Sequence, residues 1–123
     1  MLLRSYMSAK IHKARVTCAN LNYVGSVTID KALLDKTGMQ VGEKVLIVNN
    51  TNGARLETYI IEGRENSGDI EINGAAAHHM NVGDEVIIIT FALSSEPVEP
   101  KAILVNEKNA FVCYLTETQG AVA

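Results

Sequence analysis

An internal repeat is the feature that most constrains the fold of this chain. Residues 39–48 read MQVGEKVLIV, and residues 80–89 repeat the pattern as MNVGDEVIII, 41 positions further on. In each copy a tight glycine turn with an acidic neighbour starts a β-branched run that is typical of a strand. A short helix candidate precedes each copy. Two helix–turn–strand units in tandem favour a small barrel with approximate two-fold internal symmetry, because two copies are too few for a solenoid.

The two helix candidates carry start and stop signals. Asp30 can cap a helix over Lys31–Thr37, and Gly38 can end that helix in a left-handed turn. Asn73 can cap about one turn of helix through residues 75–78. We therefore expect side-chain caps at both positions.

Alternating side chains predict further strands. In residues 10–17 the odd positions share one face, and the opposite face carries Lys10, His12, Ala14 and Val16. Residues 49–53 (NNTNG) predict a hairpin turn. In the strand that follows, one face carries Arg55, Glu57, Tyr59 and Ile61.

The 123 residues predict one compact domain, and the scarcity of aromatic residues (5%) predicts an aliphatic core. Residues 94–100 (SSEPVEP) break the barrel pattern and begin a divergent C-terminal tail, residues 94–123. Within it, residues 101–115 read as a hairpin around residues 106–109. Cys18 and Cys113 show no metal or redox spacing. We expect both to be reduced in the core, with a disulfide left open.

Charge is divided unevenly along the chain. Residues 1–25 carry four basic side chains and no acid, whereas residues 26–123 carry seven basic and 14 acidic side chains. Nucleic-acid binding is disfavoured, because the chain is acidic overall and no aromatic platform accompanies the basic arm. No apolar run approaches the roughly 20 residues of a membrane span. The apolar N-terminal stretch is too short for a secretory signal, so we expect a cytoplasmic protein without membrane partners.

The Gly25–Ser26 peptide bond follows the basic arm. Glycine leaves its carbonyl carbon open and tolerates strained backbone angles, and the serine hydroxyl can reach back to that carbonyl. Three segments accompany the bond, namely residues 10–12 (KIH), 52–59 (NGARLETY) and 72–78 (INGAAAH). In type, order and spacing these segments resemble the pyruvoyl-dependent aspartate 1-decarboxylase family, from about Leu3 to Ala92. The resemblance implies a mainly β, small double-psi β-barrel with a few short helices.

The resemblance also implies self-cleavage into a small chain (residues 1–25) and a large chain (residues 26–123). Ser26 Oγ would attack the Gly25 carbonyl, and the resulting ester would break to leave a pyruvoyl group in place of Ser26. The oxyanion formed on Gly25 needs a donor, a role that the resemblance gives to Thr58. Decarboxylation of an amino acid needs an electron sink. The pyruvoyl group would supply it without pyridoxal phosphate, for which the chain shows no phosphate cradle.

L-Aspartate is the substrate that the resemblance implies, with β-alanine and CO₂ as products in pantothenate biosynthesis. Arg55 would bind one carboxylate and Lys10 the other, and guanidinium geometry suits bidentate contact. Tyr59 would be the general acid that reprotonates the carbanion carbon. Since Arg55 and Tyr59 lie roughly 13 Å apart along an ideal strand, their long side chains would have to converge on the substrate.

A run of small residues would form the wall of the pocket. Its backbone would approach the substrate at Gly74, Ala75 and Ala76, where free N–H groups at a helix start favour an anion. A supporting set would border the same cavity, namely Tyr23, Asn73 and His12. His78 belongs to the matched motif and His79 has no assigned role. We expect no metal, because no carboxylate joins these histidines at ligand spacing.

Two other interpretations of Gly25–Ser26 stay open. The bond could be an uncleaved turn in a non-enzymatic barrel that serves as a binding or assembly module. It could also mature an N-terminal-nucleophile hydrolase, in which cleavage leaves a free Ser26 amine. The family resemblance implies a homo-tetramer, and the divergent tail leaves open whether maturation needs a helper protein.

Overall fold

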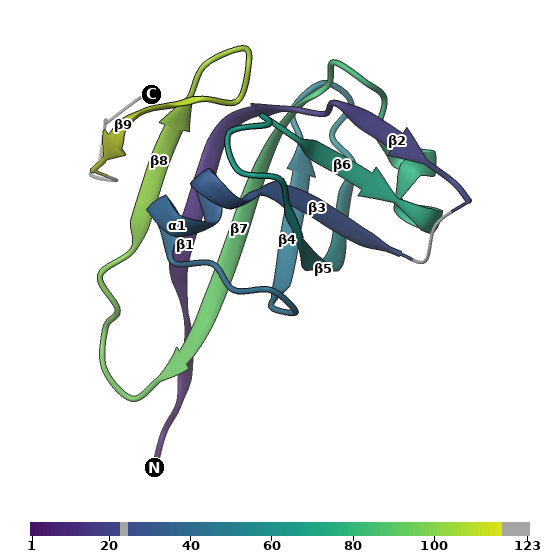
Figure 1. Cartoon of the computed structure of the whole chain (residues 1–123). Helices are drawn as coiled ribbons and strands as arrows, with labels where there is room; N and C mark the ends of the chain where they lie inside the picture. The colour runs from purple at the N-terminus through teal and green to yellow at the C-terminus, as the bar shows by residue number, and fades with distance from the viewer. Residues whose placement is uncertain (23–24, 117–123) are drawn as a thin grey trace.

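The computed structural model describes residues 1–22 and 25–116 and is mainly β with two short helices in that part of the chain, as predicted (Figure 1). The first half contains β1 (Arg4–Arg15), β2 (Cys18–Asn20), β3 (Ser26–Asp30), α1 (Lys31–Thr37), β4 (Lys44–Asn49) and β5 (Arg55–Gly63). The second half contains β6 (Ile70–Asn73), the 3₁₀ helix η1 (Gly74–His79), β7 (Glu85–Ser94), β8 (Lys101–Val105) and β9 (Phe111–Leu115).

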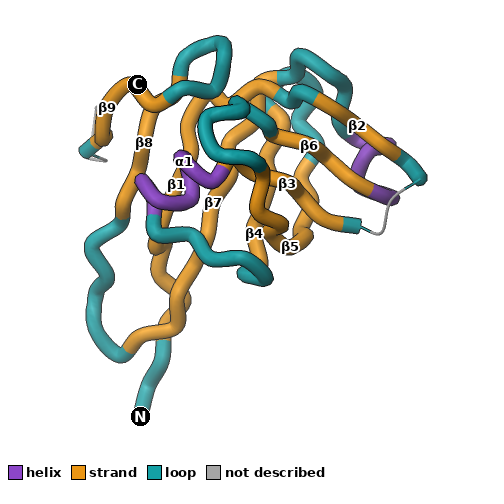
Figure 2. The backbone as a smooth tube through the Cα atoms, in the orientation of Figure 1, coloured by secondary structure: helices purple, strands orange, loops and turns teal. Residues whose placement is uncertain are grey.

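The strands form one sheet in the order β2-β6-β3-β5-β4-β7-β1-β8-β9. Consecutive strands β1 and β2 are therefore far apart in the sheet order, and the chain between them closes the sheet on itself. At this closure Thr17 N donates to Ile70 O over 2.9 Å, and Ile70 N donates to Thr17 Oγ1 over 3.0 Å. The tube in Figure 2 shows η1 beside β2 and β6 at one end of the molecule. This is the small β-barrel architecture that the resemblance implies.

The predicted internal repeat is present in the structure. Gly42 and Gly83 both have positive φ, 85° and 92°, in the turns that precede β4 and β7. In the first turn Glu43 Oε1 accepts from Gln40 N over 3.0 Å. In the second, Asp84 Oδ2 accepts from Asn81 N over 2.9 Å. Each acidic side chain thus closes its own turn, which explains why both copies pair a glycine with an acid.

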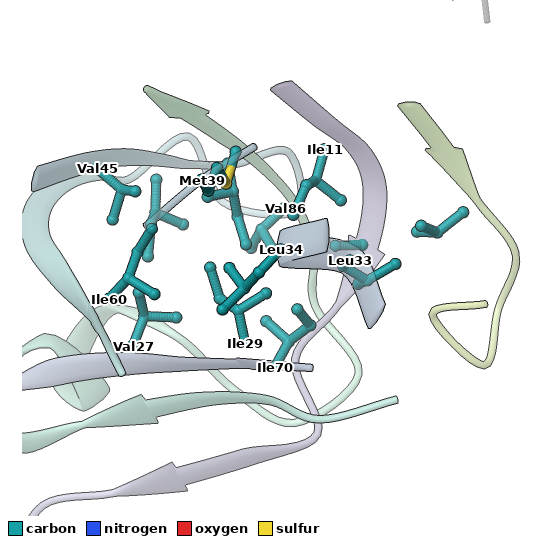
Figure 3. Close-up of a cluster of buried hydrophobic side chains, with 14 of the residues drawn as sticks. Ile11, Val27, Ile29, Leu33, Leu34, Met39, Val45, Ile60, Ile70 and Val86 are labelled. Carbon is teal, nitrogen blue, oxygen red and sulfur yellow. The ribbon is translucent and has the colours of Figure 1, made fainter. Parts of the chain in front are cut away.

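The core is aliphatic, as the composition predicts, and it lies between α1 and the inner face of the sheet (Figure 3). Leu33 and Leu34 of α1 point into a cluster that includes Val27 and Ile29 of β3. These side chains are 4% exposed or less. Because alternate β3 residues enter the core, Ser26 and Thr28 lie on the opposite face of that strand.

The alternation predicted for residues 10–17 is wrong beyond His12. Ile11 and Ala14 are both fully buried, although strict alternation puts them on opposite faces. Lys13 has a φ of 65°, and the β1–β7 register shifts between Ile11 and Ala14. A β-bulge adds one residue to a strand and so reverses which side chains face the core. The prediction failed because alternation alone does not locate a bulge.

The C-terminal hairpin is confirmed, and it belongs to the sheet. β8 pairs with β9 in antiparallel register and with β1 in parallel register, and Ile103 is fully buried. The cysteine prediction holds in part. Cys18 and Cys113 are both free, but Cys113 is exposed on β9 and Cys18 is half-buried, so neither is a buried core residue. Among the described residues, α1 and η1 have seven and six residues, and neither could span a bilayer.

Candidate active site

Ser26 begins β3 and is completely buried. It pairs directly with Asn73 at the end of the neighbouring antiparallel strand β6. Asn73 is 6% exposed, and its side-chain Nδ2 donates to Ser26 Oγ over 2.9 Å. The serine after the glycine is therefore held by a specific amide donor inside the protein.

The predicted capping role of Asn73 is wrong. Asn73 occupies the N-cap position of η1 but makes no capping hydrogen bond with its side chain. The amide instead donates to Ser26 Oγ and, over 3.1 Å, to Thr28 Oγ1. Asn73 could do this because η1 is a 3₁₀ helix that starts at Gly74 with a φ of 74°, so the chain turns away from β6 immediately after the asparagine.

β5 lies on the other side of β3 and carries three predicted site residues. Val27 pairs with Ile60 in parallel register. Extending that register backwards brings Ser26 level with Tyr59 and Gly25 level with Thr58. Tyr59 is 40% exposed on the face opposite the core, and Thr58 is half-buried on the core-facing side. The two side chains thus flank the start of β3 from opposite faces of the sheet.

Arg55 shares the outer face of β5 with Tyr59, as predicted, and is exposed. It follows the hairpin that joins β4 to β5, whose predicted turn is confirmed by hydrogen bonds from Gly53 N to Asn49 O and from Asn49 N to Ala54 O, each 2.8 Å. This turn contacts η1, because the side chains of Asn49 and Asn52 both donate to His79 O, over 3.2 and 3.1 Å. The Arg55 strand and the small-residue wall are therefore linked.

Lys10 lies on β1, which the sheet order separates from β5 by β7 and β4. The paired positions Lys10, Ile89, Leu46 and Glu57 run across these strands. Paired residues share a face, so Lys10 is on the same face as Arg55 and Tyr59, three strand spacings or about 14 Å away along the sheet. His12 is two residues further along β1 and pairs with Leu104 of β8.

The three residues of the small-residue wall differ in their exposure to solvent. Gly74 is buried, Ala76 is half-buried and Ala75 is exposed. His78 and His79 are exposed at the end of η1. Within residues 1–22 and 25–116, no group of three or more histidine, cysteine or acidic residues is arranged to hold a metal ion. Tyr23, which we expected to border the cavity, lies outside the described residues.

Three residues of this region were missed by sequence reasoning. Asn49 and Asn52 were explained as turn formers, and their side chains gave no further signal. Asn49 also donates to Asp84 Oδ2 over 2.7 Å, which joins the β4–β5 hairpin to the repeat turn that precedes β7. Thr28 looked like any β-branched strand residue. Its position two residues after Ser26 was the only signal that could have identified it.

The fold and the site define a small, mainly β barrel protein whose glycine–serine bond begins a strand next to a buried amide donor. The family described as Aspartate decarboxylase matches residues 2–112, and the chain belongs to this family. The match continues past Ser94, where the resemblance was expected to fade, and it includes β8.

Proteins named Aspartate 1-decarboxylase are similar to this chain over most of its length. The protein from Bacillus licheniformis is 59% identical over 112 residues, with 88% of each chain covered. Those from Exiguobacterium sibiricum and Listeria innocua are 51% and 53% identical over 120 residues, with 94% of each chain covered. Among solved structures, the rationally designed protein mkDPBB_sym_86 has a TM-score of 0.47 at 18% identity. It is matched over 95% of its length by 72% of this chain.

Proposed function

We propose that this chain is a self-processing, pyruvoyl-dependent decarboxylase that converts L-aspartate to β-alanine and CO₂, the step that supplies pantothenate biosynthesis. Family membership and the name shared by its relatives support the reaction. The observation that carries the self-processing is the hydrogen bond from Asn73 Nδ2 to the buried Ser26 Oγ. A turn serine at the surface would need no such donor, because water would satisfy its hydroxyl.

The cleavage is a rearrangement followed by an elimination. Ser26 Oγ attacks the Gly25 carbonyl carbon, and the bond from that carbon to the Ser26 nitrogen breaks, which gives an ester and a free amine. Loss of the Ser26 α-proton then breaks the Cβ–Oγ bond and releases the Gly25 carboxylate. The dehydroalanine left behind tautomerises to an imine and hydrolyses, so that one water is consumed and one ammonia is released.

Thr58 is the proposed donor to the oxyanion that forms on Gly25. The extended β3–β5 register supports this role, because it brings Thr58 level with Gly25. A threonine hydroxyl can donate one hydrogen bond to developing negative charge. The tetrahedral intermediate of the first step is where that donor acts.

The chemistry of the surrounding residues fits a pyruvoyl group at position 26. Such a group has two neighbouring carbonyl oxygens and no polar hydrogen, and Asn73 already directs an N–H toward this position. When present, the group supplies the electron sink that decarboxylation requires. Asn73 is the residue that would hold it.

The substrate would be held by groups on the outer face of the sheet. Arg55 binds one carboxylate through its planar guanidinium, and Lys10 binds the other as a point charge. Tyr59 returns a proton to the substrate carbon after CO₂ leaves. The backbone of Gly74, Ala75 and Ala76 would line the opposite wall, and Tyr23 and His12 are the residues that we expect to border the pocket. The shared face of Lys10, Arg55 and Tyr59 supports this arrangement.

We propose a cytoplasmic homo-tetramer as the working form, as the family resemblance implies. Large apolar side chains exposed near the ends of β1 and β7 support self-association, because Leu93 is 72% and Leu2 is 65% exposed. Light scattering coupled to size-exclusion chromatography tests the tetramer, and a monomeric mass in active protein would contradict it. Purified chain that processes itself without additions would show that no helper protein is needed.

A denaturing gel of the purified protein tests the proposed function. We expect two fragments, residues 1–25 and residues 26–123, and the larger one should resist Edman degradation because its terminus is a ketone. The Ser26→Ala variant should stay in one piece and lack activity. A wild-type chain that stays whole after prolonged incubation would favour the binding or assembly module. A larger fragment that begins with a sequenceable serine would favour the hydrolase.

A further inference from the structure

A second hydroxyl lies close to Ser26 on β3. Thr28 follows Ser26 by two residues, so both side chains project from the same face of the strand. Thr28 is partly buried and pairs with Glu71 on β6 and with Ile61 on β5. It is thus placed between the two strands that carry the proposed site.

The Asn73 amide contacts both hydroxyls of β3 at once. Its Nδ2 lies 2.9 Å from Ser26 Oγ and 3.1 Å from Thr28 Oγ1. An amide nitrogen carries two hydrogens, so these two oxygens can accept both of them. Two acceptors on one strand define the plane of the amide and turn its nitrogen, rather than its oxygen, toward Ser26. With Thr28 Oγ1 removed, only one of these two contacts would hold that orientation.

The Thr28 hydroxyl is itself held in place by packing. A Cβ atom built on Gly63 would lie 3.1 Å from Thr28 Cγ2, so the threonine methyl occupies the space that glycine leaves. Few χ1 rotamers are open to a β-branched side chain. With the methyl against Gly63, the hydroxyl is directed at Asn73, where the hydrogen bond is found.

We propose that Thr28 is a positioning residue for self-processing, acting on Ser26 through the Asn73 amide. This inference rests on the proposed function. In the elimination step Oγ takes the electron pair of the Cβ–Oγ bond and leaves as a carboxylate oxygen of Gly25. An N–H directed at Oγ stabilises that charge. The same N–H gives no help to the attack, in which Oγ must offer a lone pair. A loosened amide should therefore slow loss of the ester more than its formation.

The test compares Thr28→Val with wild type in the full chain, by following processing over time on denaturing gels. Each sample is also treated with mild neutral hydroxylamine, which cleaves an ester, and mass spectrometry identifies the product that ends at Gly25. We expect Thr28→Val to slow processing about three- to ten-fold, the effect of losing one neutral hydrogen bond. The hydroxylamine-sensitive fraction should rise above that of wild type. Thr28→Ser, which keeps the hydroxyl, should stay within about two-fold of wild type.

A matched control removes a similar bond elsewhere. Thr90 Oγ1 and Ser8 Oγ lie 2.9 Å apart on β7 and β1, and Thr90→Val should process at the wild-type rate. The inference is overturned if Thr28→Val processes as fast as wild type, or if Thr28→Ser is as slow as Thr28→Val with no gain of ester. A wild-type chain that never cleaves would instead overturn the proposed function itself, so the two failures are distinguishable.

Discussion

The two copies of the internal repeat begin their helices in different ways. In the first copy Asp30 accepts hydrogen bonds from Ala32 N, Asn66 N and Gly68 N, over 2.8, 2.9 and 2.8 Å. In the second copy Asn73 has the same position before η1, yet its side chain donates to Ser26 and leaves the helix uncapped. A carboxylate can only accept, whereas an amide can also donate. The position before the helix thus binds backbone N–H groups in the first copy and the side chain of Ser26, in the candidate site, in the second.

The C-terminal ends of the two helices also differ in which residues satisfy their backbone groups. α1 ends at Thr37 and is capped by Gly38, whose φ of 77° is left-handed and whose N–H donates to Leu34 O over 2.8 Å. η1 ends at His79 and is followed by Met80 in extended backbone, and the His79 carbonyl accepts from Asn49 and Asn52 on the neighbouring hairpin. The first helix is therefore closed by its own residues. The second is closed by the strand pair that carries Arg55, which couples it to the site.

The largest effect is expected when the amide donor of Asn73 is removed from the second copy. Asn73→Asp replaces the N–H with an acceptor and adds negative charge next to an oxygen that gains negative charge. We expect processing to slow about 10²- to 10³-fold, as for the loss of an oxyanion donor. The measurement is the half-time of cleavage on denaturing gels, with Asn73→Ala as the variant that lacks the added charge. Cleavage of both variants within threefold of wild type would contradict the assigned role.

Removing the cap of the first copy should affect stability. Asp30→Ala leaves three backbone N–H groups without their acceptor, and we expect a loss of roughly 2–4 kcal/mol. Urea unfolding in the Ser26→Ala background measures this on an uncleaved chain. Asp35→Ala is the matched control, because Asp35 is an exposed acid of the same helix. A loss below about 0.5 kcal/mol would show that the first copy does not depend on its cap.

A smaller effect is expected at the end of α1. Gly38→Ala should cost about 1 kcal/mol, because alanine is strained at positive φ although nothing lies within 4 Å of the added Cβ. Gly38→Asn should cost less, since asparagine tolerates the left-handed region. The same urea assay compares the two. Equal stability of Gly38→Ala and wild type would show that the left-handed backbone at Gly38 does not contribute to the end of α1.

The smallest effect concerns an ion pair on α1. Lys31 Nζ lies 2.8 Å from Asp35 Oδ2, and this hydrogen bond holds the pKa of Lys31 above its ordinary value. A raised pKa means that the contribution is present below the ordinary lysine pKa and is lost as pH rises through the raised one. Lys31→Met should therefore be slightly less stable than wild type at pH 7, and equal to it at high salt or high pH. A difference in melting temperature that persists in both conditions would contradict the pairing.

Much of the fold was predictable because it depends on local signals. The glycine turns, the Asp30 cap, the Gly38 stop and the hairpin before Arg55 are each specified by a few neighbouring residues. The bulge at Lys13 was not predictable, because it reflects how β1 must shift to pair with β7. Exposure of Cys113 likewise depends on β9 being the last strand of the sheet.

The candidate site was likewise predictable only in part. Ser26, Arg55 and Tyr59 could be selected because each lies in a short segment of the sequence that resembles the family. The hydrogen bonds from Asn73 to Ser26 and Thr28 could not be predicted, because they arise from the pairing of β3 with β6, whose paired residues lie more than 40 positions apart in the sequence. The local signals located Asn73 before η1 and Thr28 in a strand, but the capping hydrogen bond expected of Asn73 is absent. The pairing of β3 with β6 instead brings the two side chains together in a hydrogen bond that the local signals do not predict.

The intact mass of protein that decarboxylates L-aspartate is the most direct test of this account. Self-processing predicts two species, residues 1–25 with a free carboxylate and residues 26–123 lighter by one ammonia than a chain that begins with serine. Active material that consists of a single unmodified chain of 123 residues would contradict it.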